Sequence, residues 1–127
     1  MKLIKQKTGY DCCAAVVAML CDISLDEAKR YFPVDFNKEG ICVRDVECLL
    51  ARLGFWLRPE FVYWCNIKQD LRLSPRGLGF AQVEFKGGLL HLVAIDERNK
   101  VFDPSRDEPC SFGDYERINS VFSIRKF

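Results

Sequence analysis

The sequence predicts one α+β domain over residues 1–127, with helices in the first half and antiparallel strands in the second. Two patterns lead to this class. Before Gly54 apolar residues recur at helical spacing, and after it aromatic and β-branched residues alternate with polar ones between short turn signals. Helices followed by a run of strands are typical of α+β domains. A chain of 127 residues fits a single domain with its own core.

Three helices are expected in the first half. The first covers residues 11–20, an apolar and alanine-rich run with the acceptor side chain of Asp11 near its N-cap. The second helix begins with a capping box at Ser24 and ends before Pro33. The third spans about residues 43–53, presents one apolar face and ends at a glycine.

The second half is expected to consist of strands and turns. Strands are predicted at residues 55–64, 79–85, 89–95, 100–102 and 120–125, with a loop at residues 71–79. Turn signals at Lys86-Gly87-Gly88 and Asp96-Glu97-Arg98-Asn99 join the three middle strands. These three strands should therefore lie side by side.

Composition and charge exclude several classes of protein. Nineteen basic and eighteen acidic residues give a net charge of +1, so no overall field attracts nucleic acid or an anionic membrane. No apolar run reaches the roughly 20 residues that span a bilayer, and no signal peptide is evident. Seven cysteines, an odd number, favour reduced thiols. We expect a soluble, cytoplasmic protein with no nucleic-acid partner and no membrane segment.

Four residues together indicate a cysteine hydrolase. His91 is the sole histidine and opens an apolar strand, and Asp103 ends the next strand, where its carboxylate can orient the imidazole. Cys12 lies at the start of the first helix, where the helix dipole and free N–H groups favour a thiolate. Gln6, six positions earlier, can donate its amide to an oxyanion. Taken singly, each of these residues has an ordinary structural role.

Two blocks of sequence resemble a known family. Gln6-Lys7-Thr8-Gly9-Tyr10-Asp11-Cys12, followed by Ala14 and Met19, resembles the opening motif of the bacteriocin-processing peptidases, papain-like enzymes that cut double-glycine leader peptides. His91-Leu92-Val93-Ala94-Ile95 and Val101-Phe102-Asp103-Pro104 resemble that family's histidine and aspartate segments, and residues 40–54 its middle helix. The order of the three catalytic residue types is also the same.

The resemblance implies a papain-like fold, with N-terminal helices packed on a C-terminal antiparallel sheet. It implies that Cys12 is the nucleophile, His91 the general base, Asp103 its orienting partner and Gln6 part of the oxyanion hole. It further implies a peptide or protein substrate, with no metal and no cofactor. The family usually has glycine after the nucleophile, and this chain has Cys13, so two thiols compete for the role. The spacing from Gln6 favours Cys12.

Other interpretations remain open at this point. One is a papain-like module that binds or regulates without catalysis. Another is a related cell-wall amidase with an Asp-Cys-Ser-Gly turn, although Ser and Gly are missing after Cys12. A zinc site is disfavoured because paired Cys-x-x-Cys spacings are absent from the sequence. The sequence makes no prediction of oligomeric state.

Overall fold

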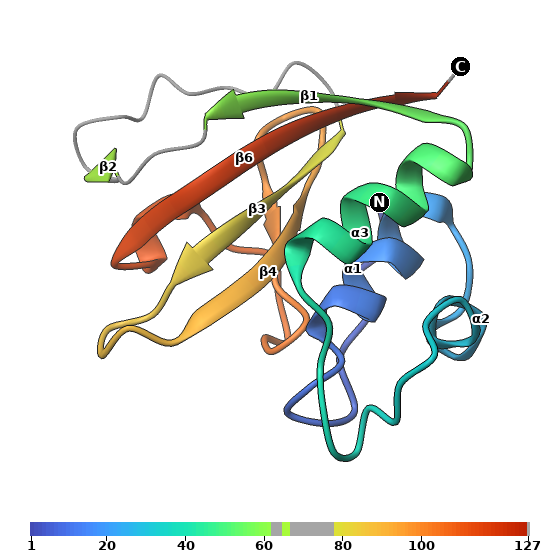
Figure 1. Cartoon of the computed structure of the whole chain (residues 1–127). Coiled ribbons are helices and arrows are strands. Elements are labelled where there is room, and N and C mark those ends of the chain that lie inside the picture. The colour runs from blue at the N-terminus through green and yellow to red at the C-terminus, as the bar shows by residue number, and fades with distance from the viewer. Residues whose placement is uncertain (62–64, 67–77, 127) are drawn as a thin grey trace.

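The computed structural model of the protein describes residues 1–61, 65–66 and 78–126. Three α-helices and a short 3-10 helix are present in this part of the chain: α1 (Cys12–Cys21), α2 (Leu25–Arg30), α3 (Val43–Arg52) and η1 (Phe112–Asp114). The strands are β1 (Phe55–Phe61), β2 (Cys65–Asn66), β3 (Gly79–Glu84), β4 (Leu90–Ile95), β5 (Val101–Phe102) and β6 (Arg117–Lys126). The three α-helices lie together on one face of a twisted antiparallel sheet (Figure 1), so the predicted α+β class is confirmed.

The order of the strands in the sheet differs from their order in the chain. The order is β1-β6-β3-β4-β5, and β2 also pairs with β6. The C-terminal strand β6 therefore lies in the centre of the sheet, between β1 and β3. Pro59, which has no N–H to donate, lies in β1 at the sheet edge, where strand proline is tolerated.

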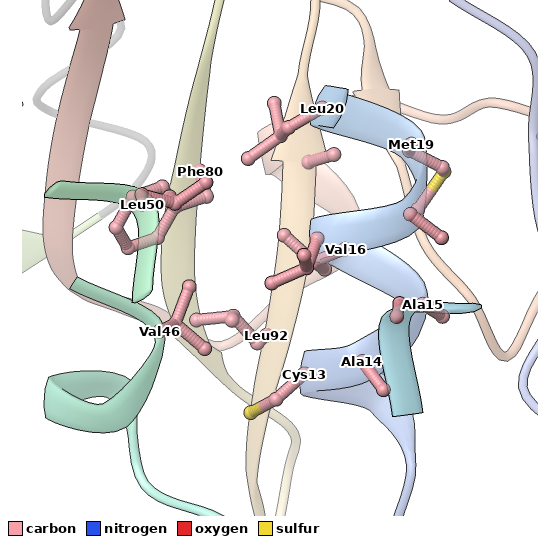
Figure 2. Packing of buried hydrophobic residues seen from close by; sticks show 14 of the residues in the cluster. Cys13, Ala14, Ala15, Val16, Met19, Leu20, Val46, Leu50, Phe80 and Leu92 are labelled. Atoms are coloured by element: carbon pink, nitrogen blue, oxygen red, sulfur yellow. The ribbon is translucent and has the colours of Figure 1, made fainter. Parts of the chain in front are cut away.

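Helix α1 forms the centre of the main core. Residues 13–20 are all buried, and the helix packs against β4, α2 and α3. Figure 2 shows Val16 of α1 near Val46 and Leu50 of α3 and Leu92 of β4. A helix that is apolar all round belongs inside a domain, because each buried valine or leucine side chain stabilises the fold by roughly 1.5–3 kcal/mol.

A second, smaller core lies on the other face of the sheet. It consists of Ala81, Val83, Val93, Ile95, Val101, Phe112, Tyr115, Ile118 and Val121. Phe112 and Tyr115 belong to the connection between β5 and β6, which folds back over this face. The connection is important for the site because it begins at Asp103.

Most locally encoded elements are confirmed. The Ser24 side chain accepts a hydrogen bond from the N–H of Glu27 at 3.1 Å, which is the predicted N-cap of α2. The hairpin between β3 and β4 turns through Gly87 and Gly88, at φ values of 101° and 91° that only glycine adopts without strain. The predicted strand residues 62–64 and loop residues 71–77 lie outside the described residues.

The last strand is longer than predicted, because β6 begins at Arg117 rather than at residue 120. A β-bulge in its pairing with β3 leaves Asn119 as an extra residue. As a result Ile118 and Val121 reach the same apolar cluster although they are three positions apart. This spacing breaks the period of two that identifies a strand from sequence.

None of the helices in the described residues is long and apolar enough to cross a membrane.

Candidate active site

Cys12 is the first residue of α1, and its side chain is half-buried. The imidazole of His91 and the backbone N–H of Leu92, both in β4, are close enough to the sulfur to stabilise its negative charge. The start of a helix also presents free N–H groups and the positive end of the helix dipole. The thiol therefore lies among donors and positive charge, which is the environment that stabilises a thiolate.

His91 lies between Cys12 and Asp103. Its Nε2 is 2.6 Å from Oδ1 of Asp103, so Nδ1 is the ring nitrogen left to face the thiol. The imidazole is 8% exposed and the carboxylate is fully buried. The ring of Phe85 lies against the imidazole, with the ring centroids 5.1 Å apart. The three residues come from α1, β4 and the end of β5, and the imidazole lies between the thiol and the carboxylate.

The short length of β5 makes room for the thiol at Leu92. Phe85 and Leu89 form a hydrogen-bonded pair next to the turn of the β3–β4 hairpin. Hydrogen-bonded and non-hydrogen-bonded pairs alternate along two antiparallel strands, so Leu92 falls in a non-hydrogen-bonded pair and its N–H points away from β3. On that side β5 pairs only with Ala94 and Ile95 of β4. The Leu92 N–H therefore has no partner in β5, and the start of α1 brings the Cys12 sulfur to it.

The pKa values of the pair follow from these contacts. The neighbouring Cys13 thiol, opposed by burial and assisted by His91 and the Leu92 N–H, lowers the pKa of Cys12 to about 4. Burial disfavours the charged imidazole, but the hydrogen bond to Asp103 and the nearby Cys12 thiol raise the pKa of His91 to about 9. Between these two values the pair exists as thiolate and imidazolium, the form that cysteine hydrolases use.

Asp103 accepts hydrogen bonds at both oxygens. Oδ1 accepts from His91, from the Ser105 N–H at 2.8 Å and from the Ser105 hydroxyl at 2.6 Å, and Oδ2 accepts from the Tyr115 hydroxyl at 2.6 Å. Burial opposes the charge, yet these donors hold the pKa of Asp103 well below its usual range. The carboxylate is therefore ionised whenever the protein is folded at neutral pH.

Cys13 has a different environment from Cys12. Its side chain is 6% exposed and points into the core beside Leu92 and Val46 (Figure 2). Its sulfur donates to the carbonyl oxygen of Ile41 at 3.5 Å. The adjacent Cys12 thiol and burial raise the pKa of Cys13. These contacts favour Cys12 as the reactive thiol of the two.

Asp11 holds the loop that precedes Cys12. It occupies the N-cap position as predicted, but its side chain does not cap α1. Its two oxygens instead accept hydrogen bonds from the backbone N–H groups of Lys7 and Thr8, both at 3.1 Å. The carboxylate also forms an ion pair with Lys29 of α2 at 2.8 Å. The backbone of Asp11 (φ −105°, ψ 18°) departs from the extended conformation that a capping side chain requires. The carboxylate therefore fixes the loop 7–10 rather than the helix.

Gln6 lies beside the other site residues through its backbone. Its N–H donates to the carbonyl oxygen of Pro104 at 2.9 Å, directly after Asp103. Its amide Nε2 donates to the Thr8 carbonyl oxygen at 2.8 Å, and its Oε1 is buried with no hydrogen-bond partner among the described residues. The side chain is thus held within its own loop, and the role of Gln6 in an oxyanion hole stays a prediction.

Sequence reasoning missed three groups in this site. Ser105 had a usable signal, since an Asp followed two residues later by Ser is a common local turn in which the carboxylate accepts the N–H. No local sequence signal pointed to Tyr115 or to the Leu92 N–H, because both reach the site through long-range packing.

Comparison with models of protein families gives no match for this chain, and comparison with curated proteins gives none either. Among the described residues, no group of three or more His, Cys, Asp or Glu side chains is arranged to hold a metal ion.

Replacement of Cys13 by alanine is expected to keep the reactivity of Cys12 while raising the pKa of Cys12 by about one unit, because the thiolate loses the stabilising effect of the neighbouring thiol. The measurement is iodoacetamide labelling against pH, with each cysteine followed by mass spectrometry. The matched variant is Cys12→Ala, in which the buried Cys13 should label slowly at pH 6. Rapid labelling of Cys13 in Cys12→Ala, together with loss of labelling in Cys13→Ala, would move the nucleophile to Cys13.

Proposed function

We propose that this protein is a papain-like cysteine hydrolase that cleaves an amide bond in a peptide or protein. The observation that carries the proposal is the line from a half-buried thiol at a helix start, through the imidazole of His91, to a buried carboxylate 2.6 Å from Nε2. The arrangement of helices on an antiparallel sheet fits a papain-like fold. The resemblance of the Cys12, His91 and Asp103 segments to the bacteriocin-processing peptidases supports the same reading.

The proposed reaction proceeds through a thioester. The Cys12 thiolate attacks the amide carbonyl carbon, and the C–S bond forms as the carbonyl becomes an oxyanion. Backbone N–H groups at the start of α1 and the second N–H of the Gln6 amide supply the donors for that oxyanion. The C–N bond then breaks, and the His91 imidazolium gives its proton to the leaving amine.

Water completes the cycle. The neutral imidazole of His91 now takes a proton from water, whose oxygen attacks the thioester carbonyl. The C–S bond breaks, the acid product leaves, and Cys12 returns as a thiolate beside a protonated His91. Asp103 stays ionised throughout, because its donors hold its pKa well below the working range.

The ion pair is tested by the pH profile of alkylation at Cys12. In the wild type the labelling rate should rise with a midpoint near pH 4 and then stay flat, because the thiolate is fully formed above that value. In His91→Ala the midpoint should move toward the roughly 8.5 of an ordinary thiol. The midpoint is the informative quantity, since nucleophilicity itself falls as the pKa of a thiol falls. A wild-type midpoint near 8.5 would contradict the proposed ion pair.

A papain-like binding module without catalysis is the second candidate. It is favoured by one observation, the hydrogen bond that keeps the Gln6 amide on Thr8. Release of p-nitrophenol from p-nitrophenyl acetate separates the two candidates without knowledge of the natural substrate. A burst followed by turnover supports the hydrolase, and acyl enzyme that never turns over, or no burst at all, supports the binding module.

A further inference from the structure

Tyr115 contacts Asp103 directly and is linked to His91 through the ring of Phe85. Its hydroxyl donates to Asp103 Oδ2 at 2.6 Å, and its ring lies 5.8 Å from the ring of Phe85, which in turn lies against the imidazole. Tyr115 is 6% exposed and belongs to the smaller core on the outer face of the sheet. The side chain is therefore fixed by packing, and its hydroxyl is fixed relative to the carboxylate.

The direction of the hydrogen bonds around Tyr115 follows from donor counting. An ionised carboxylate accepts only, so the single O–H of Tyr115 points to Asp103. The Cys110 sulfur, 3.2 Å from the same hydroxyl oxygen, is left as the donor to it. Burial and the neighbouring carboxylate raise the pKa of Tyr115, so the hydroxyl remains a donor at every pH at which the pair works.

The other contacts of Asp103 leave Oδ2 to Tyr115. His91 and both donors of Ser105 form hydrogen bonds with Oδ1. The guanidinium of Arg106 is partly exposed and comes no closer to Oδ2 than 3.7 Å. Tyr115 is thus the near donor that holds Oδ2. Rotation of the carboxylate about its Cβ–Cγ bond would break this contact and the one to His91 at the same time.

We propose that Tyr115 is a positioning residue of the proposed hydrolase. By holding Oδ2 it turns Oδ1 of Asp103 toward His91 Nε2, and so sets the orientation in which the imidazole meets Cys12. Tyr115 touches neither the nucleophile nor the imidazole proton that is transferred; it acts through Asp103. This inference rests on the proposed function of the same site.

The test is the variant Tyr115→Phe, which removes one oxygen and keeps the ring. His91 is the sole histidine of the chain, so the proton NMR signals of its ring are unambiguous. In the wild type the Nε2–H proton, bound to a carboxylate at 2.6 Å, should give a far-downfield signal. In Tyr115→Phe this signal should broaden and exchange with water faster, and acyl transfer should fall roughly 10-fold with the alkylation midpoint of Cys12 little changed.

Tyr31→Phe is the matched control, because Tyr31 is 47% exposed and lies at the end of α2. It should leave both the His91 signal and acyl transfer unchanged. A wild-type Nε2–H signal and a wild-type rate in Tyr115→Phe would overturn the positioning role. If Tyr115→Phe fails to fold, biosynthetic replacement with 3-fluorotyrosine keeps the shape and makes the hydroxyl a stronger donor. The Nε2–H signal should then shift, and an unmoved signal would overturn the role equally.

The NMR readout requires no turnover. Absence of acyl transfer in the wild type would therefore count against the proposed hydrolase, whereas the Nε2–H signal of Tyr115→Phe decides separately whether Tyr115 positions the pair.

Discussion

Replacement of Cys12 by serine is expected to abolish acyl transfer, with a loss of at least about 10³-fold. The expected loss for His91→Ala is roughly 10²–10⁴-fold, because the leaving amine then has no acid and the attacking water no base. A serine hydroxyl keeps nearly the same volume, but it is not ionised beside His91 as the thiol is. Hydrolysis of p-nitrophenyl acetate measures the rate, and far-UV circular dichroism with thermal unfolding checks the fold.

The control for this pair of variants is Cys48→Ser, which changes an exposed thiol on α3. This variant should retain the full rate. Substantial turnover in Cys12→Ser or in His91→Ala, with the fold intact, would remove the proposed mechanism. Loss of the rate in Cys48→Ser would place the reactive thiol elsewhere.

Replacement of Asp11 by alanine is expected to lower the free energy of unfolding by about 3 kcal/mol at pH 7 and to reduce acyl transfer as well. Asp11 is fully buried, and its loss leaves the N–H groups of Lys7 and Thr8 without their acceptor and Lys29 without its partner. The loop that carries Gln6 would then lose its attachment to α1. Urea unfolding measures the change in stability, and p-nitrophenyl acetate hydrolysis measures the change in rate.

The stability effect of Asp11 should also depend on pH. Burial opposes its charge, but Lys29 and the two backbone N–H groups lower the pKa of Asp11. A lowered folded-state pKa contributes stability that is complete above the unfolded value of about 3.9 and is lost as the pH falls through the folded value. The difference between wild type and Asp11→Ala should therefore shrink below about pH 4. Asp26→Ala, at an exposed carboxylate, is the control and should change stability by less than about 0.5 kcal/mol.

Local sequence signals predicted much of the fold. The capping box at Ser24 and the glycine turn at Gly87 each act within a few residues, so the sequence alone specifies them. The start of β6 was missed because the bulge at Asn119 depends on pairing with a strand more than thirty residues earlier in the chain. The central place of β6 in the sheet was likewise invisible to patterns that read one segment at a time.

The site, too, was predictable from sequence only in part. Residue type and order were sufficient to select Cys12, His91 and Asp103, and the structure places all three in contact. The side chain of Asp11 was read as a helix cap, whereas its partners are set by how the preceding loop returns over α1. The contribution of Tyr115 depends on the path of the β5–β6 connection across the outer face of the sheet, which no local pattern predicts.

The saturation of Asp103 by donors has a consequence for the charge balance of the site. With its pKa far below neutrality, the carboxylate neither takes nor releases a proton, so only Cys12 and His91 exchange protons with solvent. Between about pH 4 and about pH 9 the three groups carry one positive and two negative charges, a constant sum of −1. The contribution of these three groups to the charge of the site is therefore the same across five decades of proton concentration.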